Sequence, residues 1–428
     1  MSDPVNEPMQ LVEHFFRHES AGLVAVLAKK FGFELIDVIE DMVQEAMLQA
    51  LRTWRLRGIP ANPSAWLHRV ARNRVIDDLR RQRTHADSID LGTLTEASAD
   101  PLAIDPEAVE DSLLRMIFTC CHPSLDRNSQ LALTLKVVCG LGDQEVARAL
   151  LISPAAAKKR VTRAKRRLQL NHVQMELPAQ SLLSERLDAV HETLYLMFNE
   201  GYSATTGDRL LRIDLCEEAA RVCHMLCTGE IGLPTTRALL ALMLFHAARF
   251  EARMDSNGTT IPLELQDRRQ WDYGMMQVAD KWLERSAEGD EVSRYHLEAG
   301  IARIHCRAPS TDETNWEAIL KHYDRLLEHF PSPMHELNRA IVLGRLGREQ
   351  MAFESLQRIE ESQILEMYPL LHCAFGDLFS RTGKLAEAKQ HWQKAMQLVA
   401  SDHERKFIET KLEELQRAIS AKKPADQP

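Results

Sequence analysis

"DQEVARALLISPAAAKKRVTRAKRRL", residues 143–168, is the stretch that decides the fold of this sequence. Its first part carries apolar residues at helical spacing. Its second part begins with Ser153, which can cap a helix, and Pro154, which suits the first helical turn. Val161, Ala164 and Leu168 then recur along one helix face. Because the junction "LIS" has about the length of a helix-turn-helix turn, we predict two short helices joined by that turn.

The second predicted helix is strongly basic. Residues 153–168 contain seven Lys and Arg residues and no Asp or Glu, although the whole chain has a formal net charge of −9. In a helix-turn-helix the second helix enters the major groove, where its first turns meet base edges and its basic flank meets phosphates. A solvated basic face is the alternative. On the DNA-binding interpretation the expected contacts are Ser153, Ala155, Lys158, Lys159, Arg160, Thr162, Arg163 and Arg166.

Length and composition are typical of a multidomain soluble protein. The 428 residues favour two or three domains, and 45% hydrophobic with 27% charged residues is ordinary for globular chains. No apolar run approaches the roughly 20 residues that span a bilayer, and the N-terminus lacks a signal-peptide pattern. The eight cysteines show no regular disulfide spacing and are expected to be reduced thiols. We therefore expect a cytoplasmic protein with no membrane partner.

The charge is unevenly distributed along the chain. Residues 1–85 carry about +1, residues 86–111 about −8, residues 112–170 about +8 and residues 171–428 about −10. These shifts predict four units: a near-neutral head, an acidic linker, a basic module and an acidic tail. The linker, rich in Asp, Ser, Thr, Ala and Pro, is interpreted as extended or mobile, with an inert spacer as the alternative.

The head contains a second pair of predicted helices. Residues 37–54 form an amphipathic pattern with a polar side that is mostly acidic, and Gly58, Pro60 and Pro63 interrupt it. A basic helix is predicted from residue 65, and Trp66 is expected to pack in the hydrophobic core. The acidic side consists of Asp37, Asp41, Gln44 and Glu45. The polar side of the basic helix includes Arg69, Arg72, Asn73, Arg74, Arg80 and Arg81.

Three stretches carry a family resemblance. "DMVQEAMLQALRTW", "WLHRVARNRVIDDLRR" and "GDQEVARALLISPAAAKKRVTRAKRRL" resemble, in this order, regions two and four of bacterial RNA polymerase sigma factors of the extracytoplasmic-function type. The resemblance covers residues from about 10 to 170. It implies that the acidic side of residues 37–45 docks on polymerase core. It also implies that residues 55–64 with the basic helix capture the melted −10 promoter element, and that region four binds the −35 element. By the same analogy the acidic linker would thread the RNA exit channel.

The tail of about 258 residues has helical periodicity almost throughout. Near its end Gly347 aligns with Gly383 and Ala352 with Ala388, an offset of 36 that is close to the tetratricopeptide period. Together with "FNEGYSATTGD", residues 198–208, this resembles the subgroup of these sigma factors that has a fused tetratricopeptide-like extension. The resemblance implies that the extension regulates activity, with an unknown protein or small ligand as its possible partner.

Residues Phe198, Asn199, Glu200, Gly201 and Tyr202 match the signature of that subgroup and are the candidate regulatory residues. The alternative is structural: a Gly-centred turn that ends a helix. Cys216, Cys223, His224 and Cys227, or Cys120, Cys121 and His122, could suggest a metal, but they also suit buried helix positions. No phosphate loop, nucleophile elbow or dinucleotide fingerprint is present, so we expect no enzyme activity, metal or cofactor.

The sequence thus predicts an all-α protein with two small helical sigma domains, an acidic linker and a large helical extension. Its predicted function is an alternative sigma factor that binds RNA polymerase core and promoter DNA and is regulated by its extension. A stand-alone helix-turn-helix regulator with a helical-repeat sensory domain is the alternative, and it would not need the acidic helix side at residues 37–45.

Overall fold

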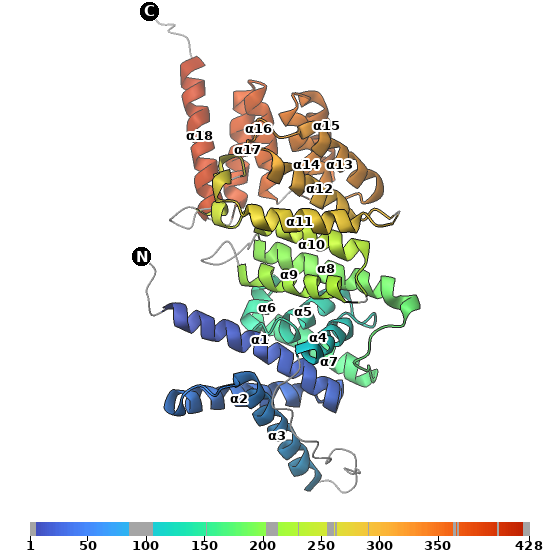
Figure 1. Cartoon of the computed structure of the whole chain (residues 1–428). Helices are drawn as coiled ribbons and strands as arrows, with labels where there is room; N and C mark the ends of the chain where they lie inside the picture. The colour runs from blue at the N-terminus through green and yellow to red at the C-terminus, as the bar shows by residue number, and fades with distance from the viewer. Residues whose placement is uncertain are drawn as a thin grey trace, which may run out of the picture. The chain divides into compact units, whose positions relative to one another are not determined.

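The computed structural model describes residues 6–84, 106–150, 152–202, 213–229, 231–254, 261, 263–289, 291–362, 365, 368–399 and 402–422. In these residues the regular elements are α-helices and short 3₁₀ helices, without a β-strand (Figure 1). The all-α prediction is therefore confirmed for the part of the chain that is described. The chain divides into two compact units, Met1–Met197 and Phe198–Pro428.

The first unit begins with α1 (Asn6–Phe31), the 3₁₀ helix η1 (Phe33–Leu35), α2 (Ile36–Arg57) and α3 (Pro63–Thr84). α1 packs on α2, and α2 packs on α3 (Figure 1). The buried face of α2 follows helical periodicity through Ile36, Ile39 and Val43, which are fully buried. Gly58 ends α2 with a φ of 81°, in the left-handed region that a side chain would disfavour.

Four further helices follow in this unit: α4 (Pro106–Cys120), α5 (Arg127–Val137), α6 (Asp143–Ala149) and α7 (Pro154–Leu170). Ser153 caps α7, because its hydroxyl accepts a hydrogen bond from the Ala156 amide at 3.2 Å. The tight turn between α6 and α7 is closed by the Ile152 amide, which donates to the Ala147 carbonyl at 3.0 Å. The predicted helix-turn-helix is present, with both α5 and α6 packed on α7.

Two sequence-based boundaries differ from the structure. Most of the predicted acidic linker, residues 86–105, lies outside the described residues, but residues 106–111 already belong to α4. At the second boundary, predicted at residue 170, the first unit continues into α8 (Leu183–Tyr202), which follows the 3₁₀ helix η2 (Gln180–Leu182). The reason is packing: the Cys121 thiol lies 3.7 Å from the Thr193 hydroxyl, and the Cys139 thiol 3.1 Å from the Met197 sulfur.

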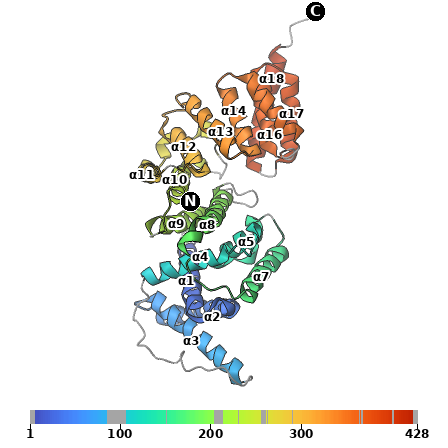
Figure 2. The same ribbon diagram turned by 90° about the vertical axis from the view of Figure 1, so that its right-hand side faces the viewer.

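The second unit contains α9 (Ile213–Thr228), α10 (Pro234–Ala247), α11 (Tyr273–Ser286), α12 (Arg294–Arg307) and α13 (Trp316–His329), followed by α14 (Pro333–Arg345), α15 (Glu349–Glu361), α16 (Pro369–Arg381), α17 (Leu385–Leu398) and α18 (Asp402–Lys422). Three 3₁₀ helices lie between α10 and α11: η3 (Glu251–Arg253), η4 (Leu263–Leu265) and η5 (Arg268–Gln270). From α12 onward, consecutive helices pack as pairs (Figures 1 and 2).

The internal offset of 36 residues corresponds to a structural repeat of helix pairs. Pro333 and Pro369 both start a helix of 13 residues, α14 and α16. Gly347 and Gly383 then take positive φ values of 69° and 75° at the turns to α15 and α17. Such turns need the left-handed conformation, which explains why glycine occupies both positions.

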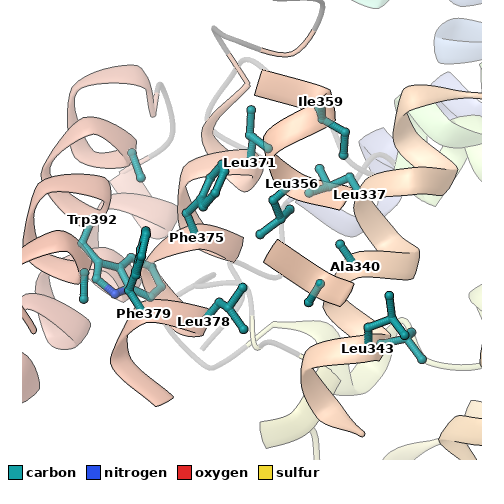
Figure 3. Close-up of a cluster of buried hydrophobic side chains, with 14 of the residues drawn as sticks. Leu337, Ala340, Leu343, Leu356, Ile359, Leu371, Phe375, Leu378, Phe379 and Trp392 are labelled. Carbon is teal, nitrogen blue, oxygen red and sulfur yellow. The ribbon is translucent and has the colours of Figure 1, made fainter. Parts of the chain in front are cut away.

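The repeats share one hydrophobic core. Leu337 and Leu343 on α14, Leu356 on α15 and Phe375 on α16 point into it, and Trp392 on α17 closes one side (Figure 3). Next to this core a cavity of about 480 Å³ is lined by apolar side chains such as Leu378 and Phe407. Arg345, Arg381 and Lys411 add cationic groups to its lining.

Candidate nucleic-acid interface

The basic helix α7 has two distinct faces. Ala157, Val161, Ala164 and Leu168 are buried, which follows the helical period expected for a packed face. Every predicted DNA contact on this helix is exposed except Arg160, which is half-buried. The exposed contacts are Ser153, Ala155, Lys158, Lys159, Thr162, Arg163 and Arg166. The structure therefore brings the predicted contacts to one solvent-facing surface of α7.

One basic residue of α7 does not face solvent. The Lys165 side chain is only 7% exposed, and its ammonium lies 2.7 Å from a Glu40 carboxylate oxygen and 3.0 Å from an Asp37 carboxylate oxygen. Burial alone would lower the pKa of Lys165, but Glu40 and Asp37 outweigh it and the net shift is upward. Lys165 thus remains a cation that anchors α7 to the start of α2, a role that the basic run did not reveal.

A second contact strengthens this anchor. The Gln169 amide donates to the Glu34 carbonyl at 3.1 Å and to an Asp37 carboxylate oxygen at 3.4 Å. Glu34 lies in η1, which packs against α7. Asp37, predicted as a polymerase contact, is therefore engaged by the basic helix in this conformation.

The other predicted polymerase contacts lie along α2. Asp41, Gln44 and Glu45 are exposed, on the side away from the buried stripe that starts at Ile36. Leu48 and Leu51 continue the exposed surface toward the end of the helix. A surface that combines carboxylates with exposed leucines suits a helical protein partner better than nucleic acid.

The basic side of α3 is also largely solvent-facing. Arg69, Asn73, Arg80 and Arg81 are exposed, whereas Arg72 and Arg74 are half-buried. Arg74 forms an ion pair with Glu45 and donates to the Gln49 side chain at 2.9 Å. This pair joins a predicted DNA contact to a predicted polymerase contact, so Arg74 fixes α3 against α2 in this conformation.

Two exposed apolar side chains lie at the junction of α2 and α3: Leu56 in the last turn of α2, and Ile59 in the loop that follows. Leu56 is 85% exposed and Ile59 is 71% exposed. Trp66, expected in the core, is only half-buried, and its ring packs edge-on against Trp54, with ring centroids 5.6 Å apart. Exposed apolar groups beside a basic helix can contact an unstacked base while arginines contact its phosphates.

The five candidate regulatory residues lie at the end of α8. Gly201 is buried and helical, as the last residue but one of α8, so the helix-ending turn stays a prediction for the residues that follow. Phe198 is buried, Asn199 is exposed, and Glu200 and Tyr202 are half-buried, while residues 203–208 of the same motif lie outside the described residues. The Tyr202 ring stacks on Phe198 at 5.9 Å and lies 4.8 Å from the His246 ring.

The cysteines that could have suggested a metal are buried thiols. Cys216 donates to the Phe198 carbonyl at 3.4 Å, and Cys223 donates to the Thr236 carbonyl at 3.5 Å. Burial raises the pKa of the Cys223 thiol well above its ordinary value. Across the described residues, no cluster of three or more His, Cys, Asp or Glu side chains is arranged to hold a metal ion. Within the same residues, none of the helices has the length and apolar character needed to cross a membrane.

Three known protein families match successive parts of this chain. The family Sigma-70 region 2 matches residues 19–85, and the family Sigma-70, region 4 matches residues 115–168. A family of unknown function, DUF6596, matches residues 186–287.

Relatives of two kinds support this division. An uncharacterized protein of Rhizobium meliloti strain 1021 is 35% identical over 389 residues, which span 90% of this chain and 91% of that protein. The ECF RNA polymerase sigma factor SigL of Mycobacterium tuberculosis strain H37Rv is 30% identical over 132 residues, which span 31% of this chain and 72% of SigL. No solved structure matches the chain.

Proposed function

Because the chain belongs to the extracytoplasmic-function family of RNA polymerase sigma factors, we propose that it binds polymerase core, recognises −35 and −10 promoter elements and starts transcription under the control of its helical extension. Its sigma domains make it a transcription initiation factor and not an enzyme. The observation that carries the proposal is the division of α7 into a buried apolar face and an exposed basic face.

Recognition of the −35 element would use the exposed face of α7. Ser153 and Ala155 lie in its first turn, where small side chains allow the helix N-terminus to approach base edges. Lys158, Lys159 and Arg163 follow on the exposed surface and supply the charge that DNA phosphates attract. Arg160, Thr162 and Arg166 complete the proposed contact set.

Capture of the opened −10 strand would use α3 and the loop before it. Arg69, Arg72, Asn73, Arg80 and Arg81 would hold phosphates, and the exposed side chains of Leu56 and Ile59 would contact an unstacked base. Arg74 would contribute mainly by holding α3 on α2, since Glu45 and Gln49 already bind it.

Core polymerase would dock on the exposed side of α2, through Asp37, Asp41, Gln44 and Glu45. Lys165 and Gln169 bind Asp37 in the conformation described, so docking of polymerase would compete with α7 for this residue. We propose that region four leaves its contact with α2 when the holoenzyme forms. Such an exchange would keep the DNA-binding helix restrained until core is present.

Regulation by the extension is proposed from its architecture. The paired helices α12 to α17, with an internal offset of 36 residues, resemble a tetratricopeptide array, and such arrays form surfaces for partners. The proposed regulatory residues Phe198, Asn199, Glu200, Gly201 and Tyr202 would act where α8 enters this extension.

Promoter-dependent transcription with purified core polymerase and a promoter library tests the function. The full chain should initiate at some of the promoters, whereas Lys159→Ala with Arg163→Ala should initiate at none of them. Arg417→Ala is the matched control, since this exposed cation on α18 lies outside the proposed surface. If the full chain fails to co-purify with core and starts no transcript, a stand-alone DNA-binding regulator replaces the sigma assignment.

A further inference from the structure

The second unit contains a cluster of arginine and aromatic side chains that the sigma function does not use. Arg249 follows α10 and is only 8% exposed; its guanidinium binds the Tyr202 hydroxyl and lies 3.1 Å from His246 Nδ1. Arg253, in η3, lies over the Tyr202 ring at 3.6 Å from its centroid and donates to the Tyr202 carbonyl at 3.0 Å. The cluster therefore gathers around Tyr202, the last of the five candidate regulatory residues.

A third arginine joins the cluster through Trp271. The Arg268 guanidinium lies 4.7 Å from the Trp271 ring centroid, and the Arg249 guanidinium lies 5.9 Å from it. Arg268 also donates to the backbone carbonyl of His305 at 2.7 Å. Trp271 itself is buried. Residues from α8, the segment after α10, η3, η5 and α12 thus converge on one place.

These three cations are not matched by carboxylates. Within the ranges of chain that the structure describes, no Asp or Glu forms an ion pair with Arg249, Arg253 or Arg268; their partners are carbonyls, a hydroxyl, an imidazole and aromatic rings. Arginine cannot discard its proton to escape this environment. A buried guanidinium without a counter-charge is costly, so the cluster favours a negatively charged partner.

Unused hydrogen-bond donors point the same way. The Nε atoms of Arg249 and Arg253 and the Nε1 atom of Trp271 are buried and have no acceptor among the described residues. Buried N–H groups in proteins are almost always paired, so three orphaned donors around one cationic cluster need an explanation. An oxyanion accepts several N–H bonds at once, which satisfies donors and charge together.

The pKa values of two neighbouring histidines are lowered by burial and, in addition, by these arginines. Burial, and then Arg249 and Arg253, hold the pKa of His246 well below its ordinary value. Burial, and then Arg249 and Arg268, lower the pKa of His305 to about 4. Both imidazoles are therefore neutral at physiological pH, and they add no repulsion to the three guanidiniums.

We propose that Tyr202, Arg249, Arg253, Arg268 and Trp271 form a binding site for a small anion of the phosphate or carboxylate class. The guanidiniums supply the charge, the Trp271 indole supplies a neutral donor, and Tyr202 links the site to α8. This site does not depend on the sigma function, and promoter experiments neither support nor weaken it.

Thermal unfolding and calorimetric titration of the full chain test the proposal. The probes are inorganic phosphate, acetate and succinate, each compared with sodium chloride at equal ionic strength. Phosphate or a carboxylate should raise the unfolding temperature in a saturable way, and the more effective probe identifies the anion class. If no probe exceeds the chloride control, the proposal is wrong.

Point variants locate the site. Arg253→Met and Trp271→Phe should each weaken anion binding at least several-fold, and Arg249→Met should weaken it most. Trp271→Phe keeps an aromatic ring and removes only the orphaned donor, so it stays informative if Arg249→Met does not fold. Arg269→Met is the matched control, because Arg269 is a neighbour in sequence but is 90% exposed and paired with Asp267. Unchanged binding in both Arg253→Met and Trp271→Phe would overturn the proposal.

A competing occupant is the chain itself. Asp208 and Asp255 follow Tyr202 and Arg253 in the sequence and lie outside the described residues. If the wild type binds no anion but Asp208→Asn or Asp255→Asn does, an internal carboxylate fills the cluster and the proposed external ligand is refuted.

Discussion

Two groups of basic residues in this molecule differ in what surrounds them. On α7, Lys158, Lys159 and Arg163 stand in solvent on one face of a helix. In the second unit, Arg249 is buried and shares aromatic neighbours with Arg253 and Arg268. Exposed cations can follow an extended polyanion and exchange its counterions at little desolvation cost. Buried cations with fixed geometry suit a small anion that fits between them.

The contrast teaches that burial, more than the number of positive charges, separates the two kinds of site. Lys165 shows this within a single helix: it belongs to the same basic run as Lys159, yet it is buried and bound to Glu40. The basic run on α7 therefore serves two purposes, with one face proposed for DNA and one cation for contact with α2.

Removal of the exposed cations should have the largest effect. We expect the combined change of Lys158, Lys159 and Arg163 to Ala to weaken promoter binding roughly 100-fold or more, given about 1–3 kcal/mol for each lost base contact. The slope of the logarithm of the binding constant against the logarithm of salt concentration should also fall, by about 0.9 for each lost phosphate contact. Binding titrations over a range of salt concentrations measure both. An unchanged slope would show that these residues do not contact the DNA backbone.

Removal of the buried cation, Lys165, should instead lower the free energy of unfolding. Lys165→Met leaves Glu40 as a half-buried carboxylate without its partner, and we expect a loss of about 2–3 kcal/mol in the free energy of unfolding. Denaturant unfolding measures this loss. Lys158→Met, a change at an exposed position of the same helix, is the control and should stay within about 0.5 kcal/mol of the wild type.

The double variant Lys165→Met with Glu40→Met sharpens this test. Removal of both partners should restore part of the lost stability, because the less exposed carboxylate, Glu40, is gone, and Asp37, the other partner of Lys165, is exposed to solvent. A double variant that is as unstable as the sum of the two single variants would show that the ion pair is not the source of the effect. If α7 competes with polymerase for Asp37, Lys165→Met should also raise the affinity for core.

Gly376 and Gly344, in the helical repeats, allow a comparison of two substitutions whose effects on stability should be smaller. An added Cβ at Gly376 would lie 2.7 Å from the Trp392 ring, whereas at Gly344 it would lie 3.9 Å from the nearest side chain, Leu378. Gly376→Ala should therefore destabilise the chain by about 1–3 kcal/mol through overpacking. Gly344→Ala should be neutral or stabilising by up to about 1 kcal/mol, since Ala favours a helix. Equal effects of the two changes on thermal unfolding would contradict the packing of α16 against α17.

Much of the fold follows from local patterns in the sequence. Ser153 and Pro154 mark the start of α7, and the apolar spacing of Val161, Ala164 and Leu168 identifies its buried face. Gly347 and Gly383 mark equivalent turns, because each turn needs a positive φ value that glycine adopts readily. These signals depend on neighbours within a few residues, and so they can be found without a structure.

Features that depend on distant contacts could not be found in this way. Lys165 looks like any other basic residue of its run until α2 brings Glu40 against it, 125 positions away in the sequence. Arg249, Arg253 and Arg268 were not singled out at all, because their clustering emerges only when separate segments of the second unit are brought together. A run of closely spaced Arg and aromatic residues after α10 is the sequence signal that could have drawn attention to them.

The smallest expected effect concerns His305 and tests the positive potential of the buried arginines. Its pKa of about 4 lies below the ordinary value of 6.5, so the unfolded chain binds a proton more readily than the folded chain as the pH falls. Stability from this group is therefore complete above about pH 6.5 and is lost toward pH 4. Between pH 7 and pH 5 the loss should be about 1–2 kcal/mol. Denaturant unfolding at both pH values measures it in the wild type and in His305→Asn, with His172→Asn as an exposed control. His305→Asn should reduce the pH dependence by that amount, whereas His172→Asn should leave it nearly unchanged. If saturating phosphate also reduces the pH dependence in the wild type, the anion offsets the charge of Arg249 and Arg268, which adds to the effect of burial on the pKa of His305. The arginine cluster then behaves as a discrete anion site, unlike the exposed face of α7.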